Sequence, residues 1–226
     1  MKTLLPGLLF FWLTASVCAA SVEEGMAAFE KQDYEQTLRI LRPLAEQGNA
    51  DAQHRIAVMH RHGLGVPPGD AEALYWYVTA ARQGHILAQN SAAVMYQFGM
   101  GTAVDLAEAA HWFGEAASRG HAKAQENYGL MLLNGQGIAQ NDKQAARWLS
   151  MAAEQGMPKA QMSIGLLYLA GRGVHQSDSY GMQWIEKAAI AGHQEARQAL
   201  ARAYEGGLFG LKKDPERAKF WFEQAK

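Results

Sequence analysis

Small and apolar residues recur at intervals of three and four along most of this chain, which is the spacing of a buried helix face. In residues 86–121 the first run of them consists of Ala88, Ala92, Ala93 and Tyr96. A Gly-x-Gly pair then interrupts the run, and a second helical pattern follows it. Glycine readily adopts the left-handed conformation that ends a helix. The pattern therefore predicts helices joined in pairs by glycine turns.

The same pattern returns every 36 residues. Four sets of residues share this register: Trp76, Trp112, Trp148 and Trp184; Gly63, Gly99, Gly135 and Gly171; Gly65, Gly101, Gly137 and Gly173; and the Ala-Gln pairs at 52, 88, 124 and 160. A fixed period of 20–50 residues is the signature of a solenoid. We therefore predict an all-α fold, a right-handed α/α solenoid of helix-turn-helix repeats at 50–85, 86–121, 122–157, 158–193 and 194–226. One inserted residue near Leu208 and Phe209 moves the last tryptophan to Trp221.

Particular residues are expected to begin and to anchor these helices. The second helix of each repeat is expected to bury its tryptophan together with an Ala-Ala pair. N-caps, whose side chains accept free backbone N–H groups, are predicted at Asp70, Asp105, Asp142 and Asp178. Asp105 and Glu108 have the spacing of a capping box. His85, His121 and His193 each follow a glycine that closes a repeat, and we interpret them as turn residues that cap helix ends.

The N-terminal part differs in kind. Lys2 precedes an apolar stretch from Leu4 to Val17, and small residues follow. This order predicts a signal peptide over residues 1–20, whose removal takes away Cys18, the one cysteine. We therefore expect an exported protein, in the periplasm or secreted, with no membrane insertion after cleavage. Residues 21–49 read as a shortened helical hairpin.

The repeated pattern A-x-A-Q-x(6)-Y-x-x-G-x-G-x(5)-D-x(3)-A-x-x-W-x(3)-A-A-x-x-G resembles the Sel-1-like repeat family, a relative of the tetratricopeptide repeats. Residues 21–49 resemble a tetratricopeptide hairpin. His60 and Leu132 depart from the pattern where it has tyrosine, and Gly181 departs from it in a second helix. The resemblance implies an adaptor that binds proteins.

The sequence contains little that indicates catalysis or the binding of metals or nucleic acids. The sequence holds no Ser-x-x-Lys, G-x-S-x-G, H-E-x-x-H or P-loop motif. His54, His60 and His62 are spaced by six and two residues, so one helix face does not present all three to a metal. A net charge of -1 disfavours nucleic-acid binding. We predict no enzyme activity and no cofactor. Some cysteine-rich members of the resembled family are linked to β-lactam binding or hydrolysis, and their paired cysteines are missing here.

What remains is a surface for a protein or peptide partner. In tetratricopeptide-like stacks the first helices line the concave face, and this register selects His54, Val58, Arg61, His62, Asn90, Val94, Gln97, Phe98, Glu126, Leu130, Leu133, Asn134, Met162, Leu166, Leu169, Gln198, Arg202 and Glu205. Val94, Leu130 and Leu166 would form an apolar stripe in the middle of a peptide groove. The alternative is that these side chains pack between the two helix layers.

Three functions fit these features to different degrees. The first is a non-enzymatic scaffold of the bacterial cell envelope. The second is a secreted or surface factor that binds host proteins, and the third is an enzyme acting on β-lactams, which has the least support. Self-association through the C-terminal repeat is a further expectation, because no polar capping helix follows Ala225.

Overall fold

A computed structural model describes residues 21–225, and within this range the chain forms twelve α-helices and no strand. The helices are α1 (Val22–Glu30), α2 (Tyr34–Glu46), α3 (Ala50–His62), α4 (Asp70–Arg82), α5 (Ile86–Phe98), α6 (Leu106–Ser118), α7 (Ala122–Asn134), α8 (Asp142–Glu154), α9 (Pro158–Ala170), α10 (Asp178–Ile190), α11 (Gln194–Gly206) and α12 (Pro215–Gln224). The predicted signal peptide lies outside the described residues.

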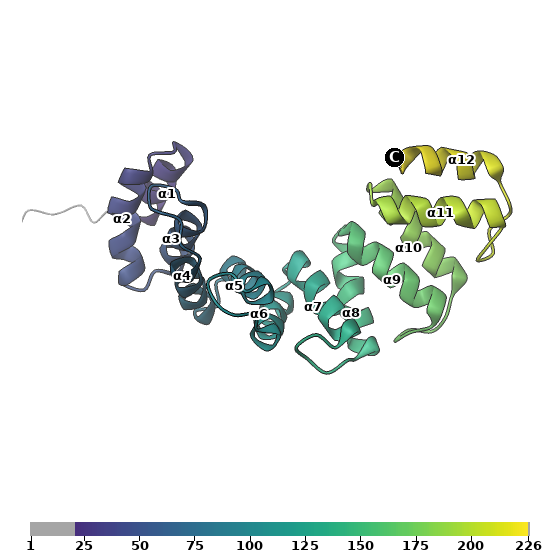
Figure 1. The fold of residues 1–226 in the computed structure, drawn as a ribbon, viewed down its shortest axis with the longest axis horizontal. Helices are drawn as coiled ribbons and strands as arrows, with labels where there is room; N and C mark the ends of the chain where they lie inside the picture. The colour runs from purple at the N-terminus through teal and green to yellow at the C-terminus, as the bar shows by residue number, and fades with distance from the viewer. Residues whose placement is uncertain (1–20, 226) are drawn as a thin grey trace, which may run out of the picture.

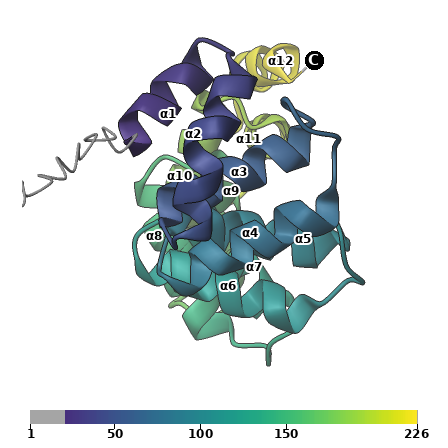
Figure 2. The same ribbon diagram turned by 90° about the vertical axis from the view of Figure 1, so that its left-hand side faces the viewer.

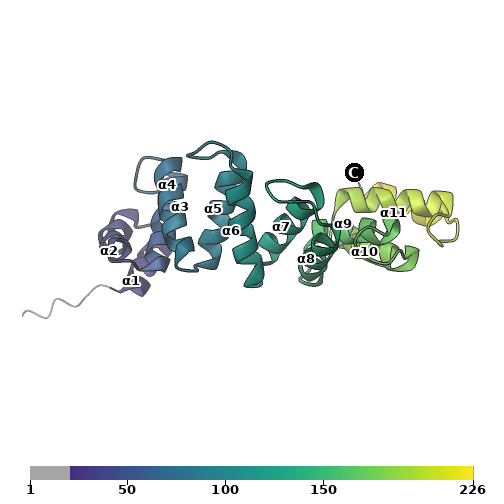
Figure 3. The ribbon, with the colours of Figure 1, turned by 90° about the horizontal axis from the view of Figure 1, so that it is seen from below.

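The helices pack in the order of the chain. Each packs on the next one, both within a pair such as α3 and α4 and between pairs such as α4 and α5. Figure 1 shows that the pairs follow an arc, with α5 on its inner side and α6 on its outer side. In Figure 3 the pairs stand in a row, and in Figure 2, seen from the N-terminal end, they wind about a common centre. The predicted all-α solenoid of paired helices is confirmed.

Alanine dominates the contacts inside the solenoid. The predicted Ala-Ala pairs of the second helices, such as Ala116 and Ala117 on α6, are fully buried. The prediction that the tryptophans join them is wrong for all but Trp112: the others are only partly buried. Small residues let the helix backbones come close, which leaves little room for an indole. An indole also carries a polar N–H, so it suits the edge of a core better than its centre.

The glycine turns confirm the predicted helix ends. Gly99 ends α5 with φ +66, and its counterparts after α3, α7, α9 and α11 adopt the same left-handed conformation. The second position of the turn requires glycine for a different reason, which is lack of space. A Cβ at Gly137 would run into the carbonyl of Leu106, at the start of α6 in the preceding repeat. The second glycine therefore lets the turn of one repeat lie directly on the backbone of the repeat before it.

Of the caps predicted at Asp70, Asp105, Asp142 and Asp178, the structure confirms Asp105, whose carboxylate accepts the N–H groups of Ala107 and Glu108. The capping box there is incomplete, because the N–H of Asp105 bonds to the Tyr96 carbonyl and the Glu108 carboxylate accepts the Trp112 indole N–H. The structure records no bond between Glu108 and the backbone of its cap residue.

Asp70, Asp142 and Asp178 are first residues of their helices, one position after the caps Gly69, Asn141 and Ser177. Asn141 and Ser177 supply the side-chain acceptors in their place. A carboxylate in the first turn still meets the positive end of the helix dipole favourably. Its position also leaves it free to pair with arginine, as described below.

The first helices begin as predicted. The ring nitrogens Nδ1 of His85, His121 and His193 accept the N–H groups of Ala88, Ala124 and Ala196 at 3.1, 3.2 and 3.3 Å. An imidazole nitrogen accepts a hydrogen bond only when it carries no proton. Met157 stands at the same place before α9 and gives no side-chain cap.

A buried glutamine joins each of the first four repeats, at 50–85, 86–121, 122–157 and 158–193, to the pair of helices before it. The side-chain amide donates to the carbonyl of the residue eight positions earlier, at the end of the preceding second helix, in Gln53, Gln89, Gln125 and Gln161. In two repeats a second glutamine completes the arrangement, since Gln83 donates to Gln53 Oε1 and Gln155 donates to Gln125 Oε1. These bonds fix how successive pairs sit on each other, and so shape the inner surface.

Candidate protein-binding surface

The 36-residue period places one residue of each regular repeat at the same point on a first helix. The row, called here the central column, consists of Val58, Val94, Leu130, Leu166 and Arg202, on α3, α5, α7, α9 and α11. Val58, Val94 and Leu130 pack with part of their side chains against the core and expose the rest. Leu166 is 48% exposed. These side chains are therefore neither filling the core nor free of it, and they present apolar surface.

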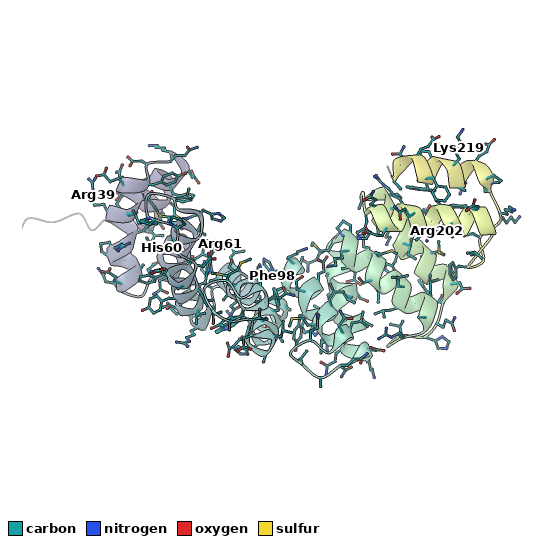
Figure 4. The ribbon with its side chains drawn as sticks, viewed as in Figure 1. Arg39, His60, Arg61, Phe98, Arg202 and Lys219 are labelled. Atoms are coloured by element: carbon teal, nitrogen blue, oxygen red, sulfur yellow. The ribbon has the colours of Figure 1, made fainter. Side chains whose placement is uncertain are left out.

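The positions beside the column are mostly accessible. Gln97, Leu133 and Leu169 are half-buried, and Phe98, Asn134 and His62 are exposed. In Figure 4, Arg61 and Phe98 lie on the side of the ribbon that the arc surrounds. Apart from one residue on α7, the predicted residues on α5, α7 and α9 are thus at least partly accessible.

Glu126 is an exception among the predicted contact residues. Its side chain is buried, one carboxylate oxygen is 2.7 Å from the ammonium of Lys123, and the other has no hydrogen-bond partner in the described part of the chain. A partner lying on the surface does not reach this side chain, so Glu126 leaves the candidate set. Its counterparts Asn90, Met162 and Gln198 are half-buried and remain in it.

The side chain of His54 also packs against other residues of the solenoid. Its ring stacks on that of His85, with centroids 4.5 Å apart and planes at 21°, and lies 5.6 Å from the Tyr77 ring. Burial first, and then the nearby His85, lower the pKa of His54 from its ordinary 6.5 to about 4. The ring is therefore neutral at physiological pH, and it contributes to packing more than to charge.

The charges of the surface are gathered at its two ends. At one end Arg61 donates to the Asp70 carboxylate at 2.7 Å and also contacts the sulfur of Met100. At the other end are Arg202 and Glu205, both exposed. The predicted residues on α5 and α9 carry no charge. Apart from the buried Glu126, the predicted contact residues in the middle three repeats are therefore apolar or neutral.

An apolar pocket of about 440 Å³ opens beside the central column. Its walls include Leu133, Leu166 and Leu169, which belong to the predicted set, and also Phe209 and Arg172, which do not. The Arg172 guanidinium is held in place by two bonds of 2.9 Å to the Asp142 carboxylate. Ligand pockets in proteins commonly have volumes of 300–1,000 Å³, and this one falls within that range.

Sequence reasoning missed Phe209 and Arg172, although the repeat register contains a signal for the first. Position 209 is where the second glycine of the turn would recur, 36 residues after Gly173. The chain places a phenylalanine there. The turn that follows is one residue longer than in the other regular repeats, since α12 is capped by Asp214, 37 residues after Ser177.

Other kinds of site find no support in the described residues. Within residues 21–225 no cluster of three or more His, Cys, Asp or Glu side chains is placed to hold a metal ion. None of the helices in that range is both long and apolar enough to cross a membrane.

Comparisons with known proteins agree with this architecture. A model of the Sel1 repeat matches residues 50–85, 86–121, 122–157, 158–193 and 194–226. A Sel1 repeat protein from Oxalobacter formigenes is 33% identical, with a TM-score of 0.85 over 91% of this chain and 84% of that one. A protective antigen of uropathogenic Escherichia coli strains is also 33% identical, with a TM-score of 0.83 over 90% of this chain, which spans 44% of that protein.

An immunity protein from Pseudomonas aeruginosa shares the fold, with a TM-score of 0.50 at 17% identity over 89% of this chain and 81% of that one. The comparison with curated proteins gave no match. Five consecutive matches to one repeat cover well over half of the sequence, and the structure supplies the paired helices that such repeats form. The chain therefore belongs to the Sel1 repeat family, whose solenoid is a fold for protein interaction and typically not for catalysis.

Proposed function

We propose that this protein is an exported, non-enzymatic adaptor of the bacterial cell envelope that holds a segment of a partner protein on the inner side of its arc. The observation that carries the proposal is the central column. Val94, Leu130 and Leu166 expose apolar surface in three consecutive repeats, and the predicted residues on α5 and α9 carry no charge. Contiguous exposed apolar surface commonly marks an interaction site.

The geometry favours a segment that contacts several repeats at once. The three side chains recur at one position on α5, α7 and α9, so an extended strand or a helix lying across these helices touches them in turn. The structure supports a rigid surface, because the buried glutamines and glycine turns fix each repeat on its neighbour. A preformed surface loses little entropy when it binds.

The test is capture of partners from an envelope extract by the purified chain. One variant carries glutamate at Val94, Leu130 and Leu166. The matched control carries glutamate at Tyr75, Tyr180 and Ile190, three exposed large apolar residues on the second helices. Burying an unpaired carboxylate costs several kcal/mol, so the first variant should weaken capture ~100-fold or more while the control keeps it. Equal capture by the wild type and the first variant would refute the proposed surface.

A second candidate function is a secreted or surface-exposed factor that binds host proteins. The specific observation in its favour is that one similar structure is described as a protective antigen of uropathogenic strains. Cell fractionation separates the two candidates. Recovery of the protein from the culture medium would favour the second, and recovery with the periplasmic fraction would favour the adaptor.

A further inference from the structure

The pocket beside the central column is bordered by the turn of the fifth repeat. That turn has a phenylalanine, Phe209, where the turns of the other four repeats have their second glycine. In four repeats the second turn glycine has φ between +69 and +74, and its lack of a side chain lets the turn lie on the repeat before it. In the fifth repeat Phe209 adopts the same left-handed conformation, with φ +53. This conformation is unfavourable for a residue with a Cβ and persists only where something else compensates for it.

Burial of the Phe209 side chain does not explain why a phenylalanine occupies this strained position. Phe209 is 40% exposed, so much of its ring is in contact with solvent. The rest of the ring forms a wall of the apolar pocket, opposite side chains of α7 and α9 that include Leu133 and Leu169. An aromatic residue is thus held in a strained turn where a glycine would be relaxed. It helps to enclose this pocket, and it also lines a second one that includes Asp178 and Glu186.

The walls of the pocket carry positive charge only. No carboxylate belongs to its walls, and its only charged wall residue is Arg172. Asp142 holds two of the three guanidinium nitrogens of Arg172, which orients the group. Arg202 follows Leu166 in the central column, is exposed, and takes part in no ion pair within residues 21–225. A ligand that complements this pocket would therefore have an apolar group with a negative charge beside it.

We infer that the pocket enclosed by Phe209 is an anchor site for an apolar side chain of a partner segment that carries a carboxylate within one or two residues of it. The inference deepens the proposed function and rests on it. Leucine, isoleucine, methionine or phenylalanine would enter between Leu133, Leu169 and Phe209. The adjacent carboxylate would face Arg202 or the free nitrogen of Arg172. Positively charged flanking residues would be rejected by the same two arginines.

The probe for this site is a phage-displayed library of random twelve-residue peptides, selected on the purified chain. Selected peptides are synthesised with a fluorophore, and their Kd is measured by fluorescence anisotropy. We expect them to share an apolar residue next to Asp or Glu. Leu169→Glu and Phe209→Gly should each weaken binding at least tenfold, and Arg202→Glu should weaken acidic peptides and improve binding of their lysine-substituted forms.

Phe209→Gly separates binding from folding. Glycine relieves the strained turn, so the melting temperature should stay unchanged or rise while the peptide affinity falls. The matched control is Gln32→Gly, which relieves the other left-handed residue that is not glycine, in the turn between α1 and α2. The control should behave alike in melting and leave the Kd unchanged. A purely structural Phe209 would instead give a lower melting temperature and an unchanged Kd.

Two results would overturn the inference in distinguishable ways. Peptides that lose affinity with glutamate at Val94 and Leu130, yet bind the Leu169→Glu and Phe209→Gly variants normally, would refute the anchor pocket and leave the proposed function standing. Peptides that lack the pairing of an apolar with an acidic residue would also refute it. Selection of no peptide that depends on any of these residues would contradict both the pocket and the proposed surface.

Discussion

His54 gives the structure a pH dependence that can be measured in the absence of any partner. The ring stacks on His85 and lies near Tyr77. Burial is the largest cause that lowers its pKa to about 4, and His85 and Arg55 act in the same direction, while Asp51 raises it. Protonating this histidine in the folded state is therefore unfavourable.

The sign of the effect follows from proton linkage. Between pH 6.5 and pH 4 the unfolded chain binds more protons at His54 than the folded chain, so the free energy of unfolding falls as the pH falls through this window. A shift from 6.5 to about 4 corresponds to roughly 2 kcal/mol between pH 7 and pH 5. Solvent screens the exposed part of the ring, and we therefore expect a contribution of about 1–2 kcal/mol.

The assay is urea unfolding at pH 7, 6 and 5 of the wild type and of His54→Gln. Glutamine is the residue at the same position of the fifth repeat, Gln198. The difference in free energy between wild type and variant should shift by about 1–2 kcal/mol over this range, in the direction that favours the variant at pH 5. His62→Gln, at an exposed position of the same helix, serves as the control. Parallel pH curves for the wild type and His54→Gln would refute the reasoning.

Three further predictions concern the junctions between repeats, each measured as a change in the free energy of urea unfolding. Met157→Asn should stabilise the chain by about 0.5–1 kcal/mol, because it supplies the missing N-cap of α9; no gain would contradict the role given to the capping residues. Ala191→Gln should add about 0.5–1 kcal/mol, because the new amide can donate to the unpaired Gln161 Oε1 in the way that Gln83 donates to Gln53 and Gln155 donates to Gln125. Gly137→Ala should cost about 2 kcal/mol or more, whereas Gly156→Ala, with open space around it, should cost about 1 kcal/mol; equal losses would remove the argument from close contact.

Much of the fold is predictable because the period repeats each local signal several times. The turn glycines and the histidine caps recur in register, so a feature that is ambiguous once becomes clear in three to five copies. For three helices the pattern predicts the cap one residue too late, at Asp70, Asp142 and Asp178. The true cap positions hold three different residues, whereas the aspartate after them recurs in register. Which of two adjacent polar residues becomes the cap depends on backbone geometry that spacing alone does not determine.

The surface is predictable to a smaller extent. Register alone placed Val94, Leu130 and Leu166 on one side, yet it did not reveal that Glu126, on the same helix face, is buried against its neighbours. Burial of that carboxylate depends on how closely adjacent repeats pack. The pocket depends on Phe209, whose effect comes from a departure from the repeat. A pattern finds what the repeats share, and the features specific to one chain lie where they differ.

The central claim is that the inner side of the arc binds a partner through its apolar column. Its most direct test is isothermal titration calorimetry of an identified partner segment with the wild type, with the variant carrying glutamate at Val94, Leu130 and Leu166, and with the control carrying glutamate at Tyr75, Tyr180 and Ile190. We predict a Kd raised ~100-fold or more by the first set of substitutions and unchanged by the second. An unchanged Kd for the first variant and a raised Kd for the second would place the site on the opposite side and contradict the claim.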